Sequence, residues 1–557
     1  MSFKINKSST GVDGLDSILR GGIPTGRTAL VHGSPGTGKT ILGLQFLLAN
    51  IRAADAAIFI SFEEEAASLK QNARSLDWDL DALEKENKLA LLDLRPDPSA
   101  VLSGDFDVSG MLALIEGTIK RINAKYLVID AIDILLKLIE SEIRMRNQVY
   151  LLHSWLLERN LTTFITAKIH RETVEFPFLE FAVDCVLRLY PRNTDNQCLL
   201  HVLKYRGSDF AKGQHPYTIC SRGIVMNPLV RSEIHFGSIG EYVSSGFPDL
   251  DSQLGGGYRL GSAVFLSGAS GTGKTLFASK FAEHLCKDGK KVLYINFEEP
   301  KDSMIALMSK SGIDLASCVE KELLVITSRL PEAWGPEEHL NADLDRIKEL
   351  KPEFVVIDAV SACARMGSQK AGFSYIIRII LYCKRQSITL LLTSQTGRAR
   401  HPGDLDRFGI SSLIDTIISL DYVPIGGEVN RTCLVVKSRG AHHSNQYREF
   451  VISERGVRFL DVYTGTGGML TGVARQEQEL REEYERRQRK RNILEKEEEL
   501  EFLRSRDAAQ RAEIEAQVRR AETELVDLKH EAEISLESDK QRKQMRSQRQ
   551  EAYQESE

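Results

Sequence analysis

The octapeptide GSPGTGKT occupies residues 33–40, and the closely related GASGTGKT occupies residues 268–275. Both fit the pattern G-x-x-x-x-G-K-[ST], in which glycines let consecutive backbone N–H groups curl around a phosphate chain. The helix that follows points its positive end at the same anion, the lysine reaches the outer phosphates, and the last hydroxyl ligates magnesium. The two loops therefore predict two sites for ATP and Mg²⁺.

Each phosphate loop lies in the context that the motif requires. The apolar strand patterns TALVHG and AVFLSG precede the loops, and helical patterns follow them. We assign phosphate and magnesium binding to Gly33, Ser34, Gly36, Thr37, Gly38, Lys39 and Thr40 in the first loop, and to Gly268, Ser270, Gly271, Thr272, Gly273, Lys274 and Thr275 in the second.

The two loops belong to a long internal repeat. GVDGLDSILRGGIPTG from Gly11 aligns with GFPDLDSQLGGGYRLG from Gly246, and IFISFEEE aligns with LYINFEEP, both at the offset of 235 residues that separates the loops. Later landmarks keep nearly this spacing, at YLVID and FVVID and at KYRGS and KSRGA. The sequence therefore predicts two related domains, at residues 1–230 and 246–472, joined by a linker at 231–245.

Within each half, short β-branched runs alternate with longer helical patterns such as ILGLQFLLANI. This alternation is typical of βαβ units with a parallel sheet that is buried on both faces. The later part of each half, at residues 184–203 and 415–436, has strand-like runs joined by the turn-like NTDN and IGGE. We therefore predict α/β domains with added antiparallel hairpins.

The last 85 residues have a different composition. From Val473 onward there is neither Gly nor Pro, and residues 474–557 hold 19 basic and 23 acidic side chains. Apolar residues spaced alternately by four and three predict a coiled-coil seam, which comprises Ile514, Val518, Ala521, Leu525, Leu528 and Ala532. Upstream the seam is weaker, because charged residues take the place of apolar ones at Lys490, Glu497 and Arg504. We expect a long helical arm at 473–557 that pairs with other subunits; a solvated single helix is the alternative.

The composition excludes several classes of protein. Hydrophobic residues make up 42% of the 557 residues and charged residues 27%, and no stretch reaches the ~18 apolar residues of a membrane span. The net charge of −5 does not indicate a dedicated nucleic-acid binder. The eight cysteines form no CxxC pair, and the first residues lack a signal-peptide pattern, so we expect a cytoplasmic protein without disulfides.

Acidic residues at equivalent places complete each predicted site. Asp130 and Asp358 each end an apolar run, where a carboxylate for magnesium belongs, although an Asp there also caps strands. The pairs Glu63–Glu64 and Glu298–Glu299 follow strands after each loop and are candidates for the catalytic base or for orienting water, with an acidic helix start as the alternative.

Basic residues far along the chain from the loops are a further candidate. Lys204 and Arg206 recur as Lys437 and Arg439 in the second half. Cations at these positions would neutralise the transferring phosphate of a neighbouring subunit, as an arginine finger supplied in trans does. Surface salt bridges are the alternative reading.

Taken together, GSPGTGKT, SFEEE, YLVIDAID, KYRGSDFAKGQHPYTI and their second-half counterparts resemble the KaiC family over roughly residues 5–465. The resemblance implies two tandem RecA-like phosphate-loop NTPase domains and a homohexamer of two rings, with ATP bound between subunits. It implies slow ATP hydrolysis in the first ring, serine/threonine autokinase and autophosphatase activity in the second, and a role as a circadian clock or signalling switch.

The same resemblance points to phosphoacceptors and partners. The family's I-S-T-I-T-D-T-type stretch corresponds here to ISSLIDT, which makes Ser411 and Ser412 the candidate acceptors. A pair of serines before an apolar run is otherwise typical of a helix cap. A KaiB-like regulator is compatible with the resemblance, whereas the charged arm, in place of the family's short docking tail, argues against a KaiA-like activator. We hypothesise that the arms join two hexamers into a dodecamer.

Two other functions remain open from sequence alone. A RecA- or helicase-like DNA-dependent ATPase requires basic, aromatic loops, but RARHPGDLDRFG after Gln395 has mixed charge and little aromatic content, so nucleic acid is not the expected partner. A nucleotide-stabilised scaffold whose coiled coil recruits a partner is the other.

Overall fold

The computed structural model describes residues 5–53, 55–95, 108–139, 141–169, 176–228, 241–395, 410–425, 428–440, 442–460, 472–505, 518–526, 528–532 and 535. The chain divides into two compact units. A nine-stranded sheet forms the centre of each.

The first unit contains two small strands and the first large sheet. Its strands are β1 (Lys7–Ser8), β2 (Ile23–Pro24), β3 (Thr28–Gly33), β4 (Ala56–Ser61), β5 (Leu89–Asp93), β6 (Ala124–Asp130), β7 (Thr162–Lys168), β8 (Cys185–Tyr190), β9 (Cys198–Tyr205), β10 (Gln214–Cys220) and β11 (Gly223–Met226). Its helices are α1 (Asp13–Ile18), α2 (Lys39–Arg52), α3 (Ala66–Arg74), α4 (Leu80–Lys85), α6 (Val108–Ile122), α7 (Ile132–Leu136), α8 (Glu142–Glu158) and α9 (Phe178–Ala182).

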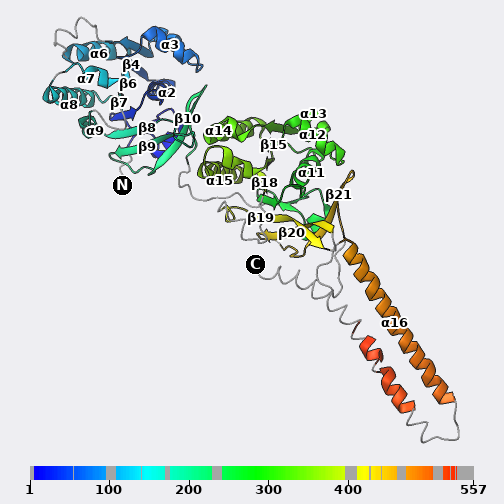
Figure 1. Ribbon diagram of the computed structural model, residues 1–557. Helices are drawn as coiled ribbons and strands as arrows, with labels where there is room; N and C mark the ends of the chain where they lie inside the picture. Colours follow the sequence, from blue (N-terminus) through cyan, green and yellow to red (C-terminus); the bar gives the residue numbers. More distant parts are fainter. Residues whose placement is uncertain are drawn as a thin grey trace. The chain divides into compact units, whose positions relative to one another are not determined.

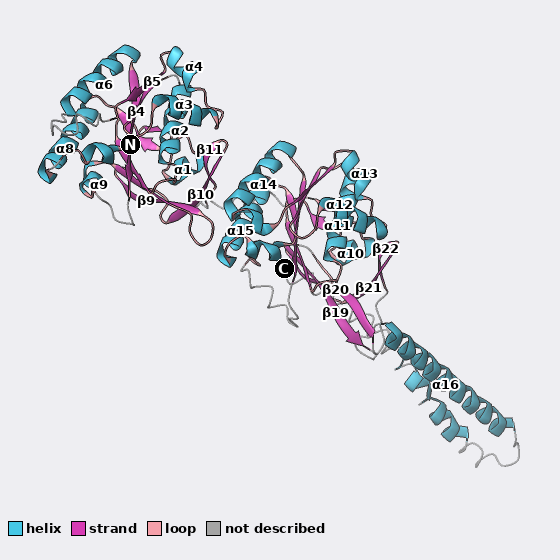
Figure 2. Ribbon diagram, turned by 45° about the horizontal axis from the view of Figure 1, so that its top comes forward, coloured by secondary structure: helices cyan, strands magenta, loops and turns pink. Residues whose placement is uncertain are grey.

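The first large sheet has the order β11-β10-β9-β8-β3-β7-β6-β4-β5. The strands from β8 to β5 pair in parallel, and β8 to β11 continue the sheet as antiparallel neighbours. Every residue of β3 is buried, as expected for a parallel strand that is covered on both faces. In Figure 2, α6, α8 and α9 cover one face and α1 to α4 the other.

The second large sheet repeats this topology with the order β16-β15-β17-β18-β14-β19-β20-β21-β22. The strands of the second unit are β12 (Tyr242–Val243), β13 (Tyr258–Arg259), β14 (Ala263–Gly268), β15 (Val292–Asn296), β16 (Leu324–Ser328), β17 (Phe354–Asp358), β18 (Thr389–Gln395), β19 (Thr416–Ile425), β20 (Glu428–Ser438), β21 (Arg448–Ser453) and β22 (Gly456–Phe459). The helices around this sheet are α10 (Pro248–Gln253), α11 (Lys274–Lys287), α12 (Lys301–Lys310), α13 (Leu315–Glu320), α14 (Pro336–Leu350) and α15 (Gln369–Arg385).

The predicted fold class is confirmed, with two tandem α/β domains and mostly parallel sheets. The predicted hairpins are also present, as β8 with β9 and β19 with β20. Of the predicted linker, residues 231–240 lie outside the described residues, and Tyr242–Val243 forms β12, which pairs with β13. The stretch RARHPGDLDRFG also lies outside them. None of the helices in the described ranges combines the length and apolar character of a membrane span.

The C-terminal arm begins with α16 (Gly472–Ser505), and a second helical stretch within residues 518–532 runs back along it (Figure 1). Lys496 Nζ lies 3.4 Å from Glu524 Oε2, and Lys529 Nζ lies 2.6 Å from Glu497 Oε1. The half-buried residues of the second stretch include Val518, Ala521, Leu525, Leu528 and Ala532 of the predicted seam, whereas Ile514 lies outside the described residues. The seam therefore faces α16 of the same chain, and pairing between subunits stays a prediction.

Candidate functional site

The first phosphate loop connects β3 to α2 as a backbone cradle. Gly36 and Gly38 adopt φ values of +78° and +88°, which side chains with a Cβ rarely adopt. Gly33 is also required, because a Cβ there would lie 2.4 Å from Thr37 Oγ1. Lys39 Nζ donates to the carbonyl oxygens of Gly33 and Ser34, at 2.8 and 3.0 Å. The lysine is therefore folded over the cradle it is predicted to serve.

The second loop, between β14 and α11, repeats this geometry. Gly271 and Gly273 have φ values of +78° and +105°. Lys274 Nζ donates to the carbonyl oxygens of Gly268 and Ala269, at 2.9 and 2.8 Å. Thr37 and Thr272 close the two loops through hydrogen bonds to the carbonyl oxygens of Ser34 and Ala269, at 2.8 and 2.9 Å. The structure thus brings the predicted residues of each loop together, including Ser270.

The carboxylate predicted for magnesium lies beside the first loop. Asp130 ends β6, and its Oδ2 accepts a hydrogen bond of 2.8 Å from Thr40 Oγ1. Thr166 Oγ1 on β7 donates to Oδ1. Burial raises the pKa of Asp130 and lowers that of Lys39, so each side chain is easier to neutralise than in water. A hydroxyl and a carboxylate held side by side fit the oxygen ligands that Mg²⁺ prefers.

Asp358 has the same position in the second domain but different partners. Thr393 on β18 donates to Oδ1, as Thr166 does in the first domain. Oδ2, however, accepts a hydrogen bond of 2.9 Å from the Tyr294 hydroxyl on β15. Thr275 and Asp358 are both described, and no hydrogen bond joins them. Lys274 has its pKa lowered by burial, and the charges of Asp358 and Glu298 oppose this shift.

Each glutamate pair lies on a turn after its strand and is held by a side chain at the strand end. Ser61 Oγ accepts from the Glu64 amide at 2.9 Å, and Asn296 Oδ1 accepts from the amides of Glu298 and Glu299 at 2.9 and 3.1 Å. The first glutamate of each pair is exposed and the second is half-buried. Burial raises the pKa of Glu64.

The first glutamate of each pair is the one that acts on the loop lysine. The charges of Glu63 and Glu298 act on Lys39 and Lys274 respectively. In the first domain, Glu63 also forms an ion pair with Lys168, whose counterpart at the end of β18 is Gln395.

The structure does not bring Lys204 and Arg206 to the phosphate loop of their own domain. Lys204 on β9 lies opposite Val186, which pairs with Leu30, and Gly33 is three residues further along β3. This separates Lys204 from the loop by about 10 Å along the strand direction. Lys204 Nζ instead donates to the carbonyl oxygens of Glu180 and Phe181, at 2.6 and 3.2 Å. The two cations thus lie at the sheet edge away from the loop.

Lys437 and Arg439 occupy the equivalent edge of the second sheet. Lys437 lies opposite Ile417, which pairs with Phe265, three residues before Gly268. Lys437 Nζ donates to the carbonyl oxygens of Ser411 and Ile414, at 2.8 and 2.9 Å. The candidate acceptors therefore lie beside Lys437 and away from their own phosphate loop. Ser411 is half-buried and Ser412 is exposed, in a turn before β19 and not at a helix start.

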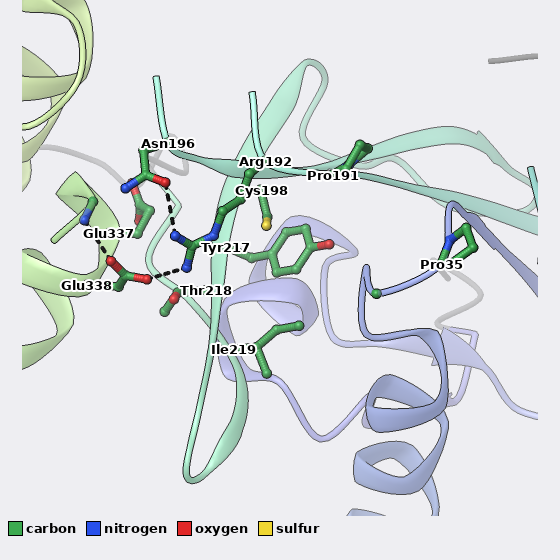
Figure 3. A pocket seen from close by; sticks show the side chains of 12 residues that line it. Pro35, Pro191, Arg192, Asn196, Cys198, Tyr217, Thr218, Ile219, Glu337 and Glu338 are labelled. Carbon is green, nitrogen blue, oxygen red and sulfur yellow. Dashed lines mark hydrogen bonds and ion pairs between the residues drawn. The ribbon is translucent and has the colours of Figure 1, made fainter. Parts of the chain in front are cut away.

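Residues that the sequence analysis missed also border the loops. The Tyr217 hydroxyl donates to the Thr37 carbonyl oxygen at 2.7 Å, and Figure 3 shows its ring directed toward the first loop, with Ile219 nearby. In the second domain, Arg431 Nε lies 3.4 Å from the Gly271 carbonyl oxygen, and its guanidinium lies 5.5 Å from the centre of the Tyr422 ring. No short motif marks these residues, which come from the later hairpins of each sheet.

Comparisons with known proteins agree with the geometry. The chain matches the family described as "ATPase: KaiC" twice, over residues 8–231 and 243–464. It is 33% identical to a circadian clock protein KaiC2 of Synechocystis sp. over 86% of each chain. It is 34% and 35% identical to circadian clock oscillator proteins KaiC of Picosynechococcus sp. and Parathermosynechococcus lividus, over 84% of this chain and 92% and 88% of theirs.

Proposed function

The chain belongs to the KaiC family of clock ATPases, and on this premise we propose that its first domain hydrolyses ATP while its second domain phosphorylates Ser411 or Ser412. The cofactors are ATP and Mg²⁺. The reading rests on the two complete phosphate loops and on the family match over both domains. No observation among the described residues favours a DNA-dependent motor or a scaffold.

The loop and carboxylate residues would hold the nucleotide in both domains. Lys39 and Lys274 exchange their bonds to backbone carbonyl oxygens for phosphate oxygens. Thr40 with Asp130, and Thr275 with Asp358, supply the hydroxyl and carboxylate oxygens for Mg²⁺, which when bound neutralises charge on the outer phosphates. Glu63 and Glu298 are the proposed bases, because they are exposed and act on the loop lysines.

The position of the basic residues supports the proposal that a second subunit completes each nucleotide site. Lys204, Arg206, Lys437 and Arg439 lie at the edge of each sheet away from its own loop. Phe181, whose carbonyl oxygen accepts from Lys204, is 71% exposed. Exposed apolar side chains beside cations are typical of an interface. We therefore propose a homohexameric ring in which each subunit offers these cations to its neighbour's nucleotide.

The same geometry supports phosphoryl transfer from the ATP of one subunit to a serine of its neighbour. Ser411 lies beside Lys437, so a ring that brings Lys437 to a neighbour's ATP also brings Ser411 and Ser412 there. The serine oxygen forms a bond to the γ-phosphorus as the bond from that phosphorus to the ADP oxygen breaks. The hydroxyl proton passes to the Glu298 carboxylate, and ADP leaves.

Mixing two inactive variants tests this proposal. Lys274→Ala chains lack the second-site donor, and Ser411→Ala/Ser412→Ala chains lack the acceptors. Neither variant alone should retain label from γ-labelled ATP, whereas rings assembled from both should carry label on the Lys274→Ala chain. Lys280→Ala, on the same helix, is the matched control and should label as the wild type does.

Three results would contradict the proposal. Wild-type chains without retained label would show that there is no autokinase. Label on Ser411→Ala/Ser412→Ala chains would show that the acceptors are elsewhere. Labelled wild type with unlabelled mixed rings would show that transfer stays within one subunit.

We also propose that the arms join two rings. Leu480, Tyr484 and Leu494 on α16 are 67%, 63% and 56% exposed, and their spacing places them on one helix face. The basic block 486–491 is followed by the mostly acidic block 495–501. Two α16 helices paired antiparallel about Ile493 would bring each basic block beside the partner's acidic block. This charge pattern supports a second copy as the occupant of the exposed face. Regulators such as a KaiB-like protein remain a proposal by family analogy.

A further inference from the structure

The two domains differ in one buried side chain beside the magnesium carboxylate. Tyr294 on β15 and Phe59 on β4 are equivalent in the repeat, at the offset of 235 residues that separates the two loops. Both are buried, and each pairs with the valine two residues before the carboxylate, Phe59 with Val128 and Tyr294 with Val356. The two aromatic rings therefore occupy the same place in their sheets, and only the second carries a hydroxyl.

That hydroxyl changes how the carboxylate is held. In the first domain, Asp130 Oδ2 accepts from Thr40, which lies in the first turn of α2. In the second domain, Asp358 Oδ2 accepts from Tyr294 at 2.9 Å. The other carboxylate oxygen is held alike, by Thr166 and Thr393. Tyr294 thus occupies the acceptor that the loop threonine uses in the first site.

The surroundings of the phenol match this role. Ser279 on α11, beside Tyr294, stands where the first domain has Leu44, so a polar neighbour accompanies the hydroxyl. Tyr294 is fully buried. A tyrosine hydroxyl carries its proton at neutral pH, so it donates its hydrogen bond to Asp358 throughout this range.

We propose that Tyr294 is a positioning residue that turns Asp358 away from Thr275 and thereby weakens the hold of the second site on its divalent cation relative to the first. A hydrogen bond donated to a carboxylate draws charge from the oxygen that would otherwise face the cation or the loop threonine. A looser cation suits a site that must exchange nucleotide between reactions. This inference rests on the proposed binding of Mg²⁺ and ATP at both loops.

Retention of radiolabelled ATP by the full chain, measured by filter binding at increasing MgCl₂, tests the inference without an activity readout. ATP retention should rise in two phases, one for each site. The variants Lys39→Ala and Lys274→Ala each remove one phase and so assign it to its site. In the wild type, the second site should need more Mg²⁺ for half-maximal retention than the first. Equal midpoints, or a lower one at the second site, would overturn the inference with no substitution at Tyr294.

Reciprocal substitutions provide the second test. Tyr294→Phe, which restores the first-domain residue, should lower the second-site Mg²⁺ midpoint by about three- to tenfold, the range expected for the net contribution of one typical hydrogen bond. The first-site midpoint should stay unchanged. Phe59→Tyr should raise only the first-site midpoint. A second-site midpoint that does not move in Tyr294→Phe contradicts the inference, as does an equal shift at both sites.

Failure of this inference differs from failure of the proposed function. If the wild type retains no ATP at any MgCl₂ concentration, the nucleotide sites themselves are wrong. If it retains ATP at both sites and the Mg²⁺ midpoints do not change on substitution of Tyr294, only the role of Tyr294 is wrong. Titration of MnCl₂ against the ATP-loaded full chain, followed by the electron paramagnetic resonance signal of free Mn²⁺, should reproduce the same order of affinities.

Discussion

His32 is a buried imidazole at the end of the strand that leads into the first phosphate loop. It is 1% exposed, and Glu180 Oε1 lies 3.1 Å from its Nε2 but outside hydrogen-bond geometry. Burial, Arg188 and Lys39 lower the pKa of His32 to about 4. Because an unfolded histidine takes up a proton near pH 6.5, the neutral ring stabilises the fold fully only above that pH.

Acid should therefore weaken the first domain through this residue. Between about pH 6.5 and about pH 4, the unfolded chain binds the extra proton, and stability falls by at most about 1.4 kcal/mol per pH unit. We expect His32→Gln to flatten the pH dependence of the free energy of unfolding in this range, measured by urea denaturation. Parallel pH profiles for variant and wild type would show that His32 does not titrate on unfolding.

At the level of single residues, the sequence predicted the residues that belong to a motif. It did not predict the side chains that form hydrogen bonds with them. Lys39, Thr40 and Asp130 lie together as expected, because the motif and the strand ends set their positions. The sequence did not predict Tyr294 and Thr393, because they donate hydrogen bonds to Asp358 from other strands and belong to no short motif. Comparing the repeats position by position is the signal that would have found Tyr294.

At the level of elements, strand alternation predicted the parallel sheets and hairpins, but it could not supply register. The location of Lys204 depends on the pairing of β3 with β8 and of β8 with β9, which no local pattern encodes. A shift of one residue in either pair would turn side chains to the opposite face. The sequence predicted a role in a neighbouring subunit's site, and the register shows that Lys204 lies away from the loop of its own domain.

The packing of the second helical stretch of the arm against α16 can be tested by substitution. Leu525 is half-buried in the seam that faces α16, whereas Val526 is 61% exposed. Leu525→Asp should release the second stretch from α16, because a carboxylate replaces apolar contact surface. Hydrogen exchange of residues 518–532 should then accelerate, while Val526→Asp should leave it near wild type. Equal protection in both variants would place the seam elsewhere.

At the level of the whole molecule, the repeat predicted two domains of one topology, and the heptad spacing predicted a helix that pairs with other subunits. Any apolar helix face of suitable spacing satisfies such a seam. In the structure, residues 518–532 of the same chain face α16. The partner of the outer face, with Leu480, Tyr484 and Leu494, is thus a separate question from the partner of the seam.

Charge reversal in the two charged blocks of α16 can decide whether two rings are joined through the arms. With ATP and MgCl₂ present, truncation before Ala474 should halve the particle mass measured by light scattering. Replacing the basic residues of 486–491 with glutamate should do the same, because each altered block would then face the partner's acidic block 495–501. Replacing Glu495, Glu498, Glu499 and Glu501 with lysine in the same chain should restore the mass, because the two blocks become complementary again while Glu497 keeps its ion pair with Lys529. A truncated protein with unchanged mass would mean that the arms do not join rings, and restoration by the double reversal would identify the antiparallel pairing about Ile493.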